Sequence, residues 1–190
     1  MTNYQIIVAG VGGQGLILTT EIISRVGMKA GYQVKSNDVV GLAQRGGKVW
    51  GSVKMAEHVF SPNISPKGGN VLLGMELLEA WRWKGHIKKG GKVILNDYRI
   101  PPVPVIAEET DYPEDIPGQL EKDFDVICVN AIEKSKALGT DKAANTLLLG
   151  ILAKHMEIEA KIWKETIQEQ VPEKSIETNL AVFDYGFNLV

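Results

Sequence analysis

Hydrophobic residues follow two patterns along this chain, short uninterrupted runs and a helical spacing. Short apolar runs predict strands at residues 5–9, 32–35, 48–55, 70–73, 92–95 and 125–129. Between and after them, apolar residues recur at helical spacing, and this pattern predicts helices over residues 16–30, 76–83, 140–155 and 160–170, with a last helix that starts at Pro172. Strands that alternate with helices are typical of an α/β protein built around a largely parallel sheet.

The first strand, helix and strand form one unit, in which Gly31 stands where a C-terminal helix cap is expected. The two strands of this unit are expected to run parallel, with a right-handed crossover. Residues 36–47 are polar and read as a connection, and the prolines of residues 100–106 favour an edge strand or an extended loop. Residues 1–190 are thus predicted to form a single domain, a Rossmann-like doubly wound α/β sheet with a helical C-terminal layer.

Composition and charge exclude several classes of protein. The chain has 190 residues, of which 44% are hydrophobic and 23% charged, as in ordinary globular proteins. A formal net charge of −2 argues against a nucleic-acid partner or an anionic membrane surface. No apolar run approaches the roughly 20 residues that span a bilayer, and the N-terminus lacks the pattern of a signal peptide. These features predict a cytoplasmic protein.

The sequence offers no obvious catalytic or metal-binding group. Its single cysteine, Cys128, lies in an apolar strand pattern and is interpreted as a small buried hydrophobe. One cysteine can neither form an internal disulfide nor supply the four thiolates of a usual iron–sulfur cluster. The three histidines are far apart, so no metal site is predicted. The common nucleophile, phosphate-loop, zinc and thiol motifs are missing, and no catalytic residue is assigned.

A glycine-rich turn follows the first strand. Gly10, Gly12 and Gly15 have the spacing G-x-G-x-x-G, and the N–H groups of the following helix favour an anion. A dinucleotide site also needs an acidic residue at the end of the second strand, where Asp38 is the only candidate and comes slightly late. NAD(P) or FAD binding, binding of another phosphate such as that of coenzyme A, and packing against a partner subunit all stay open.

A second signal lies in the polar stretch Gln44-Arg45-Gly46-Gly47. The planar, permanently charged guanidinium group of Arg45 can bind a carboxylate or phosphate, or it can pair with an acidic residue in a structural turn. The stretch occurs once, between strands, so an RNA-binding box is discounted. The candidate binding residues are therefore Gly12, Gly13, Gln14, Gly15, Arg45, Gly46 and Gly47.

Two tryptophans suggest a further hypothesis. Trp81 and Trp83 are two residues apart on a predicted helix, so they are not expected to face the same core. At least one of them is expected to be exposed, which would suit a non-catalytic interaction domain with a partner surface there.

Five motifs in order resemble one known family, the gamma-type domain of 2-oxoacid:ferredoxin oxidoreductases. They are GVGGQG at residues 10–15, GLAQRGG at 41–47, KGGKVILN at 89–96, NTLLLG at 145–150 and the closing segment 172–186. Together they cover nearly the whole chain. Within the family, residues 41–47 are most similar to the indolepyruvate branch, in its small (beta) subunit.

The resemblance implies a heteromeric enzyme whose large (alpha) subunit carries thiamine diphosphate and iron–sulfur clusters. That enzyme would convert an aryl pyruvate to an acyl-coenzyme A and reduce ferredoxin. This chain would be an accessory subunit, inactive alone, with residues 12–15 and 44–47 nearest the partner. Arg45 would contact an anionic group, either a coenzyme A phosphate or a partner carboxylate. The alternative is a stand-alone NAD(P)- or FAD-binding Rossmann-like protein.

Overall fold

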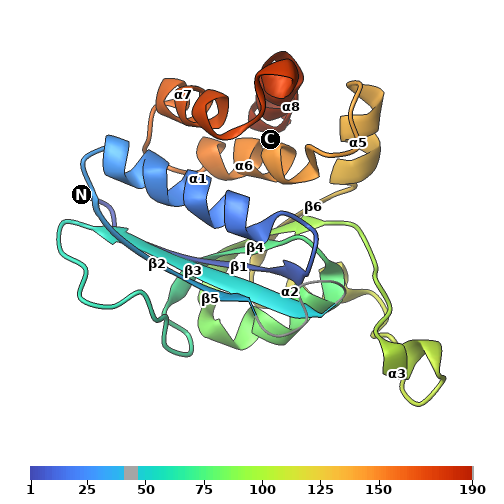
Figure 1. Cartoon of the computed structure of the whole chain (residues 1–190). Helices are drawn as coiled ribbons and strands as arrows, with labels where there is room; N and C mark the ends of the chain where they lie inside the picture. Colours follow the sequence, from blue (N-terminus) through green and yellow to red (C-terminus); the bar gives the residue numbers. More distant parts are fainter. Residues whose placement is uncertain (41–46, 190) are drawn as a thin grey trace.

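A six-stranded mixed sheet forms the centre of the molecule (Figure 1). The computed structural model describes residues 1–40 and 47–189. The strand order is β2-β3-β1-β4-β5-β6. The strands are β1 (Tyr4–Val11), β2 (Gln33–Val40), β3 (Lys48–Ala56), β4 (Gly69–Gly74), β5 (Ile87–Asn96) and β6 (Asp125–Val129). Strands β1, β4, β5 and β6 are parallel, whereas β3 pairs antiparallel with both β1 and β2.

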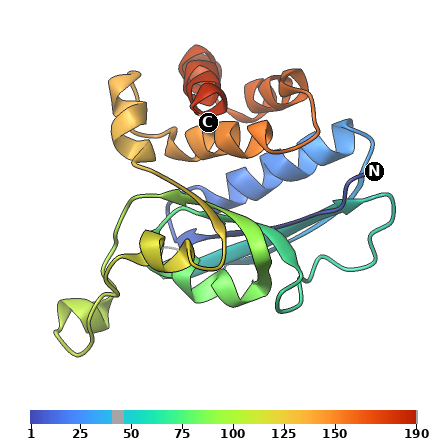
Figure 2. The same ribbon diagram turned by 180° about the vertical axis from the view of Figure 1, so that it is seen from behind.

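Helices cover both faces of this sheet. One face carries α1 (Leu16–Lys29), α5 (Ala131–Ala137), α6 (Ala144–Lys154), α7 (Ala160–Gln170) and α8 (Ile176–Asn188) (Figure 1). The other face carries α2 (Leu77–Trp83) and α4 (Ile116–Leu120), while α3 (Val103–Ile106) projects away from the body, as Figure 2 shows from behind. Single 3₁₀ turns lie at Lys84–His86 and Glu173–Ser175. The predicted doubly wound α/β fold with a C-terminal helical layer is confirmed.

The central strand explains the two-sided core. In β1, Ile6 and Val8 face the larger helical layer, and Ile7 and Ala9 face α2. Successive side chains of a strand point to opposite faces, so a strand covered on both sides must be apolar throughout. None of the helices within residues 1–40 and 47–189 has the length and apolar character needed to cross a bilayer.

Helices α6 and α8 pack backbone against backbone. A Cβ atom added at Gly150 would lie 2.3 Å from the carbonyl oxygen of Phe183, and one added at Gly186 would lie 2.2 Å from that of Leu147. Helix α6 is apolar on almost every side rather than amphipathic, as is typical of a helix that is buried all round. This contact attaches the last helix to the layer above the sheet.

The first strand–helix–strand unit differs from its prediction in one respect. Strands β1 and β2 run in the same direction, but β3 lies between them. The prediction of a connection over residues 36–47 is wrong for residues 36–40, which continue β2 and pair with β3, Ser36 opposite Val53. Residues 41–46 lie outside the described part of the chain. Gly31 does follow the end of α1, with φ +85°, and its N–H donates to Met28 O at 3.0 Å.

Strand β6 is an edge strand, and Cys128 on it is exposed, so the prediction of a buried cysteine is wrong. A short apolar run has the same pattern in a central and in an edge strand, which is why the sequence misled here. The strand predicted as one option for residues 100–106 is also wrong, because residues 103–106 form the short helix α3.

The tryptophans pack together more than their spacing predicts. Trp81 and Trp83 are both half-buried, and both pack against the core cluster beneath α2, so the expectation that they do not face the same core is wrong. The Trp83 ring lies 4.3 Å from the Trp50 ring of β3, centroid to centroid. The two residues at the end of α2 thus help to close the edge of this smaller core.

Candidate functional site

A groove of about 510 Å³ lies where the parallel strands end. Strand β1 leads into α1 on one face of the sheet, and its neighbour β4 leads into α2 on the other face (Figure 1). This divergence is the topological switch point of an open α/β sheet, where such folds bind their ligands. The glycine turn after β1 and the start of α6 form its walls.

The glycine turn needs its glycines for conformation. Gly13 has φ +100° and Gly15 has φ +75°, both in the left-handed region that other residues adopt at a cost. A Cβ added at Gly13 would have no neighbour within 4 Å, whereas one at Gly15 would lie 3.1 Å from Asn145 Nδ2. Gly13 therefore faces the open groove, and Gly15 lies against the start of α6.

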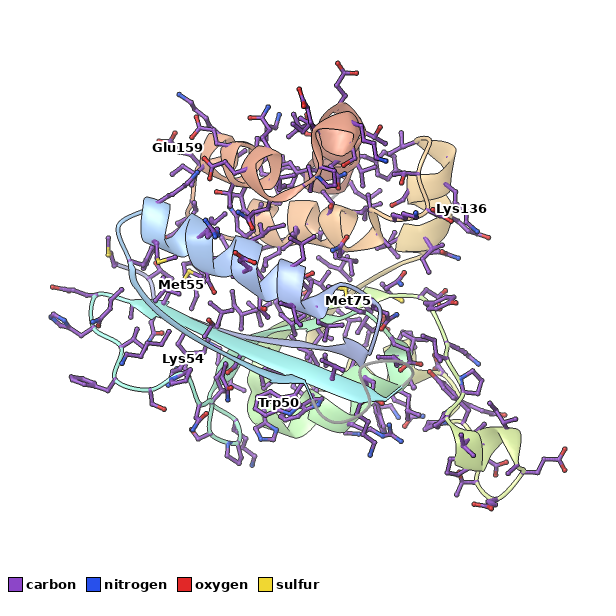
Figure 3. All side chains as sticks on the ribbon, in the orientation of Figure 1. Trp50, Lys54, Met55, Met75, Lys136 and Glu159 are labelled. Atoms are coloured by element: carbon purple, nitrogen blue, oxygen red, sulfur yellow. The ribbon has the colours of Figure 1, made fainter. Side chains whose placement is uncertain are left out.

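Gln14 joins the ends of two strands. Its Oε1 accepts from the Val11 N–H at 2.7 Å, and its Nε2 donates to the Met75 carbonyl oxygen at 3.0 Å. Asn96, at the end of β5, donates to the same carbonyl at 3.2 Å and accepts from the Ala131 N–H at 3.0 Å. Figure 3 shows Met75 beside the start of α1. Both polar atoms of Gln14 are thus used within the chain, where they fix the floor of the groove.

Two of the predicted motifs meet directly. The Gly12 N–H donates to the Gly47 carbonyl oxygen at 2.9 Å, which joins the glycine turn to the beginning of β3. The structure therefore brings Gly12, Gly13, Gln14, Gly15 and Gly47 together. The predicted residues Gln44, Arg45 and Gly46 lie outside the described residues.

The start of α6 contributes residues that motif reasoning did not assign to the site. Asn145 Nδ2 lies 3.5 Å from Thr19 Oγ1 of α1, and Asp141 and Lys142 line the rim of the groove. Helices α1 and α6 both begin here, after Gly15 and Ala143, whose side chains cannot cap a helix. Two helix starts put partial positive charge beside the groove, which suits an anionic group.

The sheet order weakens the dinucleotide interpretation. In a dinucleotide-binding fold the second strand lies next to the first and places its acidic residue by the ribose. Here β3 separates β2 from β1, so Asp38 lies on a strand displaced by one further spacing of about 4.8 Å. Among the described residues, no group of three or more His, Cys, Asp or Glu side chains is arranged to hold a metal ion.

The sequence matches the pyruvate ferredoxin/flavodoxin oxidoreductase family over residues 5–189, and the chain belongs to this family. It is 32% identical over 192 residues to the indolepyruvate oxidoreductase subunit IorB of Pyrococcus horikoshii, covering 98% of this chain and 95% of that protein. It is 37% identical over 188 residues to the subunit of the same name from Archaeoglobus fulgidus, covering 96% and 93%.

Solved structures share the fold. The gamma subunit of a keto/oxoacid ferredoxin oxidoreductase from Geobacter sulfurreducens PCA superposes with a TM-score of 0.72 at 21% identity, covering 97% of this chain and 96% of that one. A 2-oxoglutarate:ferredoxin oxidoreductase from Magnetococcus marinus, solved with 2-oxoglutarate, coenzyme A and succinyl-CoA, gives 0.78 at 20% identity. There the match covers 100% of this chain and 31% of the longer one. The resemblance drawn from the five motifs is confirmed.

Proposed function

We propose that this chain is the small, accessory subunit of an indolepyruvate:ferredoxin oxidoreductase. Full-length similarity to the archaeal subunits named IorB carries the proposal. The complex would oxidise indolepyruvate or another aryl pyruvate: the 2-oxoacid and coenzyme A give the acyl-coenzyme A, CO₂ and one proton, and two ferredoxins each accept one electron. A stand-alone NAD(P)- or FAD-binding protein is not favoured, because the family is a different one and β3 displaces Asp38.

The partner would be a large (alpha) subunit that carries thiamine diphosphate and iron–sulfur clusters. Those groups supply decarboxylation and one-electron transfer when bound. The single cysteine of this chain supports that division, since a usual cluster takes four thiolates. This chain would shape and close the active-site region of the complex.

The groove would be the surface that meets the reacting region. Gly13 faces the open groove, where another chain or a phosphate can approach the backbone closely. Gly12 and Gly15 complete the turn, and Gln14 keeps it in place. The starts of α1 and α6 would attract a negatively charged group of coenzyme A or of the partner. Arg45, with Gly46 and Gly47 beside it, would contact that same anion.

The test is to capture the tagged chain anaerobically from its native host and to assay viologen reduction with coenzyme A. The four acids to compare are indolepyruvate, phenylpyruvate, pyruvate and 2-oxoglutarate. Activity with a co-eluting larger subunit and a preference for the aryl pyruvates is the expected result. An inactive single chain from an extract that holds the activity would contradict the proposal, and preference for pyruvate or 2-oxoglutarate would correct the substrate.

A further inference from the structure

The segment of residues 97–115, here called the arm, leaves the body of the molecule between β5 and α4. It carries α3 and projects well beyond the sheet and its helices (Figures 1 and 2). Its tip folds on itself: the Ala107 N–H donates to Val103 O at 2.8 Å, and the Glu109 N–H donates to Pro104 O at 2.9 Å. The tip therefore has a defined shape away from the body.

The two ends of the arm are fixed by one buried carboxylate. Glu76, which is 1% exposed, accepts at Oε1 from the Ile100 N–H at 3.1 Å and from the Tyr112 hydroxyl at 2.6 Å. The same hydroxyl accepts from the Leu78 N–H at 3.0 Å. A segment held at both ends and containing several prolines loses little conformational entropy when it binds. The arm is preorganised rather than loose.

The arm carries an unusual set of side chains. Val103 is 76% exposed and Ile106 is 70% exposed, so the tip presents apolar surface to water. Along its length the arm also has six carboxylates and a single basic side chain, Arg99. The carboxylates belong to Asp97, Glu108, Glu109, Asp111, Glu114 and Asp115. This acidity is local, because the whole chain has a net charge of only −2.

The arm begins at the groove. Tyr98 lines the groove, and its carbonyl oxygen accepts from the Leu77 N–H at 3.1 Å. A molecule that contacts the root of the arm therefore also borders the groove. The next step rests on the proposed function, in which the molecule that covers the groove is the larger subunit. In addition, the same fold forms 31% of a longer chain in the Magnetococcus marinus structure, so this fold occurs joined to further protein.

We infer that the arm is a docking element, which inserts the apolar tip of Val103 and Ile106 into a cleft of the larger subunit. The cleft is apolar at its centre and basic at its rim, so that it complements both the tip and the carboxylates along the arm. Buried apolar anchors provide most of the affinity of such an interface, and the rim charges set its salt dependence and rate of association.

The test measures the affinity of the purified chain for the larger subunit. The variant Val103→Asp/Ile106→Asp changes two exposed positions and is expected to leave the fold intact. It is expected to weaken the complex by about 30-fold or more, the effect of losing a central anchor. The control is Phe60→Asp, which places one such carboxylate on a residue that is 94% exposed and lies in a different loop. A second variant, Glu108→Gln/Glu109→Gln/Asp111→Asn, is expected to flatten the salt dependence of binding.

The outcomes separate the arm from the proposed function. If the unmodified chain forms no complex with the larger subunit, the proposed function fails. If the unmodified chain binds and the tip variant binds equally well, the docking inference alone is overturned. A loss of equal size in Phe60→Asp also overturns it, because added charge would then explain the effect. The arm would belong to a second copy of this chain if the isolated chain were a dimer that the tip variant makes monomeric, and that result overturns the inference too.

Discussion

At the scale of single residues, Glu76 performs several structural tasks at once. It is the N-cap of α2, where its Oε2 accepts from the Glu79 N–H at 2.8 Å, and its other oxygen anchors the arm. Burial and the Glu76 carboxylate raise the pKa of Tyr112, so the tyrosine keeps its donor proton far into the alkaline range. One buried side chain thereby connects helix α2 to a distant segment.

Replacing Glu76 by Ala is expected to lower the free energy of unfolding by about 3 kcal/mol, because a helix cap is lost and several buried donors are left without an acceptor. Urea denaturation followed by circular dichroism measures this loss. Tyr112→Phe, which removes one hydroxyl, is the matched control and is expected to cost about 1–2 kcal/mol. Equal losses in the two variants would contradict the larger cost expected for the carboxylate, since Tyr112→Phe removes only the bonds of the hydroxyl to Glu76 and Leu78.

Cys128 combines an exposed position with an unreactive thiol. Although the residue as a whole is exposed, partial burial of its thiol is the main cause that raises the pKa of Cys128 to about 11, and the nearby Asp97 and Glu121 add to the shift. The folded state therefore holds the thiol proton more tightly than the unfolded state. Its contribution to stability is present below the ordinary thiol pKa and is lost as the pH rises toward 11.

Alkylation measures this effect directly. At pH 8 only about one thiol in a thousand would be ionised, and the rate of reaction with iodoacetamide is expected to rise about tenfold per pH unit up to the pKa. The chain unfolded in urea, with an ordinary cysteine pKa, serves as the control. A rate that levels off near pH 8.5 in the folded chain would contradict the raised pKa.

At the scale of secondary-structure elements, the contact between α6 and α8 leaves no room for an added side-chain atom. Gly150→Ala is expected to destabilise the chain by about 3 kcal/mol, because the new methyl group meets backbone atoms that cannot move aside without separating the helices. Thermal unfolding tests this. Gly85→Ala is the control, since an added Cβ there has no neighbour within 4 Å and is expected to change stability by less than about 0.5 kcal/mol.

The elements also show what the sequence can predict. Strand β1 and helix α1 were predicted within one or two residues, because an uninterrupted apolar run and a helical period are strong local signals. Helices α4 and α5 were not predicted. Their signals were weaker, namely Asp115 and Asn130 as N-caps that accept from the Gly118 and Glu133 N–H groups.

The same limit applies to the candidate site. The glycine turn is a local motif, and the sequence locates it correctly at the end of the first strand. Asn96 and Asn145 reach the groove only because the chain order of the sheet brings three distant segments together. Both asparagines stand in motifs of the family, at the end of residues 89–96 and at the start of residues 145–150, but neither motif by itself assigns its asparagine to the groove. The insertion of β3 between β1 and β2 likewise depends on pairing across the sheet.

At the scale of the whole molecule, the candidate site and the arm share one end of the sheet. The groove and the root of the arm both lie where the parallel strands finish. An open sheet with helices on both faces buries its sides, so its ends remain for contact with other molecules. The layered architecture explains why one region of a small chain carries both the candidate site and the docking element.

The carbonyl oxygen of Met75 accepts hydrogen bonds from the side-chain amides of Gln14 and Asn96. This junction has a practical consequence for enzymology. Neither amide ionises, so this junction keeps its hydrogen bonds unchanged over the range of buffers used in assays. A bell-shaped pH profile or a strong ionic-strength effect in the assembled enzyme would thus arise elsewhere. Substituting Gln14 by Glu would create a titrating group at the floor of the groove, and this scaffold would then respond to acid.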